Sequence, residues 1–224
     1  MRLTITFDHR EFFNKNHYIE FEGIISPDQA AALKKECEEV IAKRLQLTPA
    51  RLHQCPAPQI YQAGYDLWRD SGSIKKSTQK NTFASLASEL TQVLPIRYGF
   101  DQYFATTKCT VSAYDVPLSL QEISSMKPLA CGLLLALNDL AAPPSFFPMP
   151  LKTGSGLFIS PSFALPWPQL FSTPGLSFLL IAYAQQKTFF CADTRDPHAV
   201  SLKKLGYVFN DLLKDSLHPI LHRK

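Results

Sequence analysis

The sequence lacks any apolar run long enough to cross a membrane as a helix. Residues 154–186 carry no charge, yet four prolines interrupt them, and the remaining apolar pieces fall far short of the ~20 residues that a spanning helix needs. The first residues also lack the apolar core of a secretory signal. We therefore expect no membrane span and a cytoplasmic location. The four prolines are Pro161, Pro166, Pro168 and Pro174.

Paired cysteines are also missing. The chain has five cysteines, an odd number, and they are widely scattered without a C-x-x-C pair. This pattern argues against a disulfide framework or a zinc ribbon and favours a reducing compartment. Glycine is scarce relative to proline, nine against seventeen, which indicates a loop-rich protein rather than an all-helical bundle.

A strong charge of either sign is absent. The net charge of +4 is too small to imply a nucleic-acid partner. A metal-responsive DNA-binding regulator would need a helix-turn-helix with a basic recognition helix and a His/Cys metal cluster, so this reading ranks last. No P-loop, G-x-S-x-G, G-x-G-x-x-G or H-E-x-x-H motif occurs. The basic clusters are small and separated: Lys75/Lys76/Lys80, Lys203/Lys204 and Arg223/Lys224.

What is present in the first hundred residues is mostly helical periodicity. Alternation predicts short half-buried strands at residues 3–7 and 18–22. Ser26, Pro27 and Gln29 form a capping signal, and the apolar stripe that follows predicts a helix to about Leu45. Proline-rich residues 47–60 read as a loop, residues 61–70 as a short helix and residues 82–94 as another helix.

The second half reads as a series of strands. Residues 96–104 and 108–114 are β-rich, and Leu129 to Leu137 form a charge-free run typical of a strand buried on both faces, although a buried helix is the rival. Further strands are expected at 154–159, 176–184 and 187–193, with Gln185-Gln186 as a tight connection, whereas residues 202–213 are ambiguous. Helices followed by strands predict an α+β protein with helices packed on a β-sandwich or barrel.

Several segments, taken in order, carry a resemblance that covers most of the chain. They are residues 17–33 (HYIEFEGIISPDQAAAL), 66–68 (DLW), 95–102 (PIRYGFDQ), 202–213 (LKKLGYVFNDLL) and 218–221 (HPIL). Together they resemble the phytanoyl-CoA dioxygenase-like branch of the Fe(II)/2-oxoglutarate-dependent oxygenases, and small chlamydial proteins related to these enzymes. The resemblance implies a double-stranded β-helix, a cupin-like jelly roll, with N-terminal helices on one sheet. One domain then spans residues 1–224, with a mostly helical support region at 1–95 and the jelly-roll core and C-terminal tail at 96–224.

The resemblance also implies where a metal site belongs. Such enzymes hold iron with two histidines and one carboxylate, and their H-x-D pair falls on Leu120-Gln121-Glu122. Glu122 could supply the carboxylate, but Leu120 cannot bind a metal. The distal histidine should lie within residues 160–170 and the basic clamp for the cosubstrate within residues 175–186, yet neither segment contains one. No histidine occurs between Gly99 and Asp193, so the resemblance implies a degenerate metal site.

Other candidate sites are weaker. Asp196 and His198 have H-x-D-like spacing in reverse order, but Asp-Pro favours a turn there. His218 and His222 have helical spacing with Pro219 between them, and His53 with Cys55 has no second ligand pair nearby. Tyr114 and Asp115 are polar residues near the expected pocket.

Two functions follow from these expectations. The leading one is an oxygenase-fold protein with no catalytic, metal or cofactor residues, acting as a binding or interaction module for a protein or an apolar small ligand. In it, Phe, Leu, Pro and Trp167 of residues 157–180 fill the mouth of the barrel. The alternative is an active Fe(II)/2-oxoglutarate oxygenase that uses Glu122 and a histidine from a loop or the tail.

Overall fold

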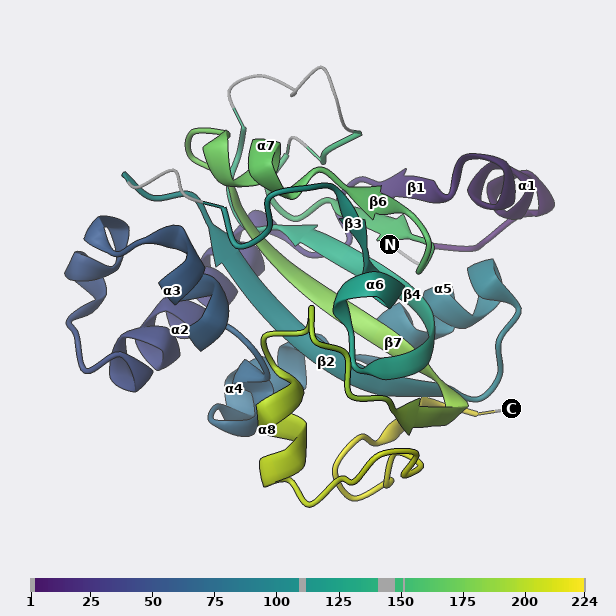
Figure 1. Ribbon diagram of the computed structural model, residues 1–224. Helices are drawn as coiled ribbons and strands as arrows, with labels where there is room; N and C mark the ends of the chain where they lie inside the picture. Colours follow the sequence, from purple (N-terminus) through teal and green to yellow (C-terminus); the bar gives the residue numbers. More distant parts are fainter. Residues whose placement is uncertain (1–2, 109–111, 141–147, 151, 224) are drawn as a thin grey trace.

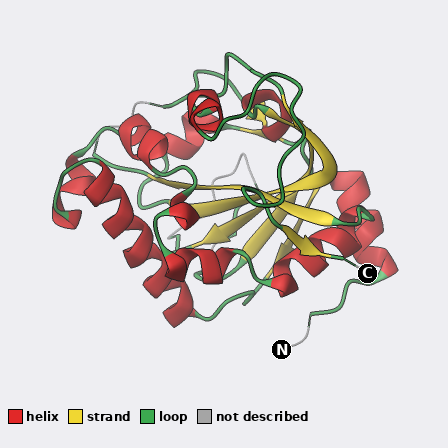
Figure 2. Cartoon of the chain, turned by 90° about the horizontal axis from the view of Figure 1, so that it is seen from below, coloured by secondary structure: helices red, strands yellow, loops and turns green. Residues whose placement is uncertain are grey.

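The computed structural model describes residues 3–108, 112–140, 148–150 and 152–223. A curved six-stranded antiparallel sheet separates two apolar cores (Figure 1). Most of the helices cover one face of this sheet, and a small second layer of two short strands and short helices covers the other, as the view from below also shows (Figure 2). The predicted α+β class is therefore confirmed, with helices packed against a sheet.

The helical layer comes from the first ninety residues. Its longest member, α2 (Pro27–Arg44), begins as predicted: the Ser26 hydroxyl accepts the Gln29 N–H at 3.2 Å, and the Gln29 side chain accepts the Ser26 N–H at 3.1 Å. This capping box satisfies two backbone donors that the first turn leaves free. Helix α5 (Asn81–Thr91) confirms the helix predicted at residues 82–94. No helix in the described ranges is long and apolar enough to cross a membrane.

The strand predicted at residues 3–7 is wrong, because Thr6 caps a helix instead. Helix α1 (Phe7–Asn16) follows directly. The Thr6 hydroxyl accepts the His9 N–H at 3.3 Å, and the Thr6 N–H donates to His9 Nδ1 at 3.2 Å. Local hydrogen bonding of this kind outweighs a short alternating pattern. The strand predicted at 18–22 is confirmed as β1 (Tyr18–Phe21).

The predicted loop at 47–60 contains two helical segments. These are a 3-10 helix at Pro49–Gln54 and α3 (Ala57–Ala63), and each has proline at its first turn. Proline is tolerated there because it removes only a donor that would be free anyway. The helix predicted at 61–70 accordingly ends early, and a 3-10 turn at Leu67–Arg69 precedes α4 (Gly72–Thr78).

The main sheet has the order β1-β5-β4-β7-β2-β8. Its interior strand β4 (Met126–Ala136) confirms the prediction for residues 129–137. Alternate residues of β4 face opposite cores: Cys131, Leu133 and Leu135 pack toward the helices, whereas Leu134 and Ala136 pack toward the second layer. The remaining strands are β5 (Gly156–Ile159), β7 (Ser177–Phe190), β2 (Ile96–Ala105) and β8 (Ile220–His222).

Two further strand predictions need correction. Gln185-Gln186 does not connect two strands, because β7 runs through it for 14 residues and pairs with β4 on both sides of the bulges near Leu129. Residue 108 and residues 112–114 form no strand, and residues 109–111 lie outside the described part of the chain. A bulge between Tyr98 and Phe100 shifts the register of β2 on β7.

The second layer lies against the concave side of the sheet. Strands β3 (Leu118–Ser119) and β6 (Ala164–Leu165) pair with each other, flanked by α6 (Leu120–Ile123) and α7 (Trp167–Ser172). Helix α8 (Ala199–Lys204) overlaps only the start of residues 202–213, whose structure the sequence left ambiguous, and the rest of that segment forms neither a helix nor a strand. The segment in which the resemblance places the metal ligands therefore lies in this second layer.

Candidate functional site

Leu120, the first expected ligand position, is part of the apolar core. Its side chain is fully buried and lies directly over Gly132 of β4: a Cβ atom added to Gly132 would come within 2.6 Å of Leu120 Cδ1. The same added atom would lie 3.0 Å from Leu180 of β7 and 3.2 Å from Ile159 of β5. Apolar side chains from β5, β7 and α6 thus meet over Gly132 of β4, at the position where the resemblance places the first metal ligand.

Glu122, the second expected position, caps the short helix α6. Its Oε2 accepts the Ser119 N–H at 2.8 Å and the Ser119 hydroxyl at 2.7 Å. Arg195 Nη1 lies 3.6 Å from the other carboxylate oxygen, and both side chains are partly exposed. The bonds from Ser119 lower the pKa of Glu122. The Glu122 carboxylate therefore caps the N-terminus of its own helix at the surface.

Trp167 closes the interior between the two layers. It is fully buried, and its indole N–H donates to the Leu118 carbonyl of β3 at 3.0 Å. Its ring packs against Tyr61 and Phe104 with centroid distances of 5.7 and 5.8 Å. Leu170 and Phe171 of α7 are also at most 1% exposed. These members of residues 157–180 are therefore buried between the two layers, whereas their expected place in the mouth of a barrel stays a prediction.

Tyr114 and Asp115, the two polar candidates near the expected pocket, lie in different environments. Tyr114 is half-buried, and its ring contacts Trp167 at 5.3 Å and Tyr61 at 5.9 Å. Burial raises the pKa of the Tyr114 phenol. Asp115 is exposed on the surface. Tyr114 thus belongs to the aromatic wall, whereas Asp115 faces solvent.

The Asp196–His198 segment forms the predicted turn but is buried. Asp196 accepts the N–H groups of Ser125 and His198, each at 2.7 Å. The His198 ring stacks on Tyr65 with a centroid distance of 4.0 Å, and its buried Nε2 has no hydrogen-bond partner among the residues that the structure describes. Desolvation, with a smaller effect from Arg44, lowers the pKa of His198 to about 3, so the imidazole is neutral near pH 7. The Asp-Pro dipeptide predicted the turn but not the burial of the Asp196 and His198 side chains.

The other histidine pairs do not assemble a metal site. His218 is buried and its Nδ1 lies 2.8 Å from the Gly99 carbonyl, whereas His222 Nδ1 lies 3.1 Å from the Asn81 side chain. The Cys55 thiol contacts the Arg51 carbonyl at 3.7 Å. Within the described ranges, no group of three or more His, Cys, Asp or Glu side chains is placed to hold a metal ion.

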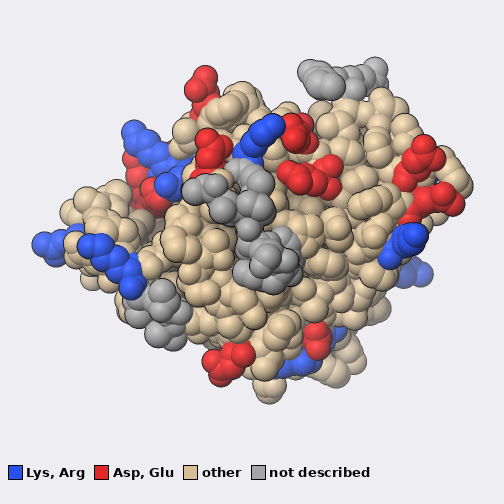
Figure 3. Space-filling model, turned by 90° about the horizontal axis from the view of Figure 1, so that it is seen from above, with Lys and Arg blue, Asp and Glu red and all other residues tan. Residues whose placement is uncertain are grey.

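Figure 3 shows the molecule from above the view of Figure 1. Acidic and basic side chains lie in the upper part of this face and around its rim, with uncharged areas between them. Arg97, Phe83 and Lys34 each line a different groove on the surface of the described part of the chain. Neither Leu120 nor Glu122 lines any of these three grooves.

Comparison with known proteins was made at the level of sequence and of structure. No protein-family model and no curated protein matches the sequence. Among solved structures, the chain is similar to SnoK, a non-haem α-ketoglutarate-dependent carbocyclase from nogalamycin biosynthesis, with a TM-score of 0.69 and 12% identity over 98% of this chain and 97% of that one.

Two further structures extend this likeness. HygX from Streptomyces hygroscopicus, solved with iron bound, has a TM-score of 0.53 and 12% identity over 94% of this chain and 98% of its own. CT296 from Chlamydia trachomatis has a TM-score of 0.51 and 16% identity over 83% of this chain and 99% of its own. At these identities the likeness concerns the fold alone. The solved structures to which the chain is similar in fold thus include non-haem α-ketoglutarate-dependent enzymes and a chlamydial protein.

Proposed function

We propose that this chain is a binding or interaction module built on an oxygenase fold, and that it does not perform iron-dependent oxidation. The observation that carries the proposal is Leu120, which packs on Gly132 where the first metal ligand would stand. Within the fold class, we place the chain in the phytanoyl-CoA dioxygenase-like branch with a double-stranded β-helix core. The colinear sequence segments support this placement, as does the pairing of β3 with β6 opposite the main sheet.

The residues present do not fit an iron centre of the oxygenase kind. Such a centre needs two imidazoles and a carboxylate on one face of the metal, and affinity also depends on groups that orient these ligands. Leu120 offers no donor, and Glu122 already accepts two hydrogen bonds from Ser119. Residues 160–170 contain no histidine, and residues 175–186 contain no cation for the cosubstrate.

Because the interior is filled by side chains, we expect a partner to bind on the outer surface. A ligand inside the fold would have to displace Trp167, whose indole is both buried and hydrogen-bonded. A protein partner on the outside requires no such displacement, so it is preferred over an apolar small ligand. The scattered free cysteines support a cytoplasmic location for this interaction.

The proposal is tested by calorimetric titration of the purified chain with Fe(II) and with Mn(II), in the presence and absence of 2-oxoglutarate, together with a succinate-release assay. We expect weak metal binding at most and no succinate, both for the natural chain and for Leu120→His, because a distal histidine and a clamp would still be missing. Stoichiometric micromolar metal binding that Glu122→Ala abolishes would overturn the proposal and favour an oxygenase with a non-standard ligand set.

A further inference from the structure

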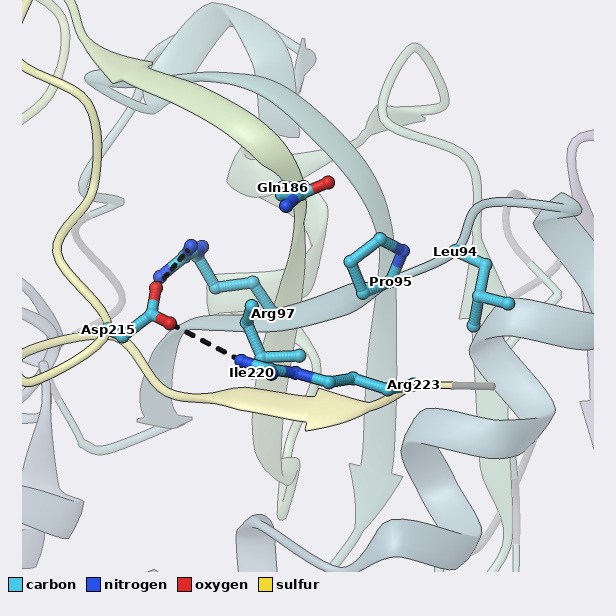
Figure 4. A pocket seen from close by; sticks show the side chains of 7 residues that line it. All are labelled: Leu94, Pro95, Arg97, Gln186, Asp215, Ile220 and Arg223. Carbon is cyan, nitrogen blue, oxygen red and sulfur yellow. Dashed lines mark hydrogen bonds and ion pairs between the residues drawn. The ribbon is translucent and has the colours of Figure 1, made fainter.

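A groove of about 690 Å³ lies where the C-terminal strand meets the main sheet. Arg97 lies at its base and is fixed by its backbone, because β2 pairs with β7 at Ala184 and with β8 at Ile220. Arg223 approaches from the C-terminal side, and the Asp215 carboxylate lies between the two guanidinium groups (Figure 4). A volume of this size suits a small molecule rather than an extended polymer.

The donors of Arg97 are not all used. Its Nη1 donates to the His218 carbonyl at 2.6 Å and its Nη2 to Asp215 at 2.7 Å. The Arg97 side chain is only 4% exposed. Its Nε is buried, yet it makes no hydrogen bond within the described part of the chain. Buried polar atoms are nearly always hydrogen-bonded, and a guanidinium is built to donate in pairs to one carboxylate or phosphate. Arg97 therefore has capacity for a further acceptor.

The charge in the groove is not balanced either. Asp215 serves both arginines, at 2.7 Å from Arg97 and 3.4 Å from Arg223, which leaves one positive charge in excess among the three groups. The nearby His218 adds none near pH 7, because burial, together with Arg69 and Arg97, lowers its pKa to about 4. The Asp215 side chain is 59% exposed, so its ion pairs are weak and readily exchanged for another anion.

We propose that this groove binds a small organic anion, a carboxylate or a phosphate, whose charged group takes the place that Asp215 occupies between Arg97 and Arg223. Gln186 lines the same groove with its side-chain amide and supplies further donors. Leu94 and Ile220 form apolar walls that accommodate a short hydrocarbon part. Asp215 acts as an internal competitor that the ligand displaces. This site is separate from Leu120 and Glu122, so it stands or falls independently of the proposed function.

The test uses the full chain, titrated with inorganic phosphate and with hexanoate, and follows the Arg Nε–H signals by NMR and binding by calorimetry. Asp215→Asn removes the competitor, and we expect about tenfold tighter binding of the anion. Arg223→Gln removes one cation, and about tenfold weaker binding is expected. The exposed Arg51, which does not line the groove, provides the matched control Arg51→Gln, for which no change is expected.

The two substitutions at the groove change affinity in opposite directions, which a general loss of stability cannot produce. Both Asp215 and Arg223 are more than half exposed, so these variants should fold. Binding of phosphate alone or hexanoate alone assigns the head group, and a shift of the Arg97 Nε–H signal places it. If neither probe binds to the natural chain or to Asp215→Asn, or if Arg223→Gln leaves the affinity unchanged, the proposal is wrong.

Discussion

Truncation of Leu120 to alanine tests whether the expected metal position is a packed core. The side chain is fully buried between α6 and three strands of the main sheet. Leu→Ala changes in cores cost about 2–5 kcal/mol, depending on how far the surroundings collapse. Because Gly132, Ile159 and Leu180 belong to hydrogen-bonded strands, little collapse is possible. We therefore expect the free energy of unfolding to fall by about 3–4 kcal/mol.

Urea denaturation measures this loss as a lower midpoint with an unchanged slope. In a chain of 224 residues, a loss of this size lowers Tm by roughly 6–15 °C. Leu212→Ala is the matched control, because Leu212 is 51% exposed and its truncation should cost less than about 1 kcal/mol. Equal small effects for both variants would refute the packing argument and indicate an open site at Leu120.

Three further variants test the surrounding interior. Gly132→Ala should destabilise the chain by about 1–3 kcal/mol, because the new methyl group would lie 2.6 Å from Leu120 Cδ1. Adding Leu120→Ala should recover part of this loss, which a double-mutant cycle measured by urea denaturation would show. Trp167→Ala should cost about 3–5 kcal/mol in the same assay, since the indole is buried and hydrogen-bonded. The pKa of His198 is lowered to about 3 in the folded chain, whereas it is about 6.5 in the unfolded chain. The stabilising effect of the neutral imidazole is therefore fully present above about pH 6.5 and is lost as the pH falls toward 3. Between pH 7 and pH 5 this contributes about 2 kcal/mol of lost stability, which His198→Phe should remove.

For each of these variants, one outcome would contradict the prediction. Strict additivity of Gly132→Ala and Leu120→Ala would mean that the two side chains do not touch. Trp167→Phe should keep most of the packing while losing the indole hydrogen bond, so it separates the two contributions, and a Trp167→Ala variant as stable as the natural chain would refute the filled interior. If His198→Phe and the natural chain lose stability equally between pH 7 and pH 5, the imidazole is not buried in its neutral form.

Local signals in the sequence were sufficient for several elements. The capping residues Ser26 and Gln29 predicted the start of α2, because a cap depends only on residues three apart. The short apolar run from Leu129 to Leu137 predicted an interior strand, because a strand covered on both faces can carry apolar side chains at every position, although periodicity alone left a buried helix as the rival. Residue types alone also showed that residue 120 and residues 160–170 contain no histidine for a metal, and that residues 175–186 contain no cation for a cosubstrate.

Tertiary contacts decided the rest. The bulge at Gly99 turns Tyr98 and Phe100 toward opposite cores, which strict alternation cannot predict. The apparent turn at Gln185-Gln186 became the continuation of β7, because a partner strand supplied the hydrogen bonds. His198 and Trp167 both contact the Tyr61 ring from distant segments, and Arg97, Asp215 and Arg223 also meet from separate parts of the sequence. Residue types alone identified the positions at which ligands of the oxygenase kind do not occur, whereas the packing of the chain decided which side chains lie there, because burial and shared hydrogen bonds arise only between residues that the fold brings together.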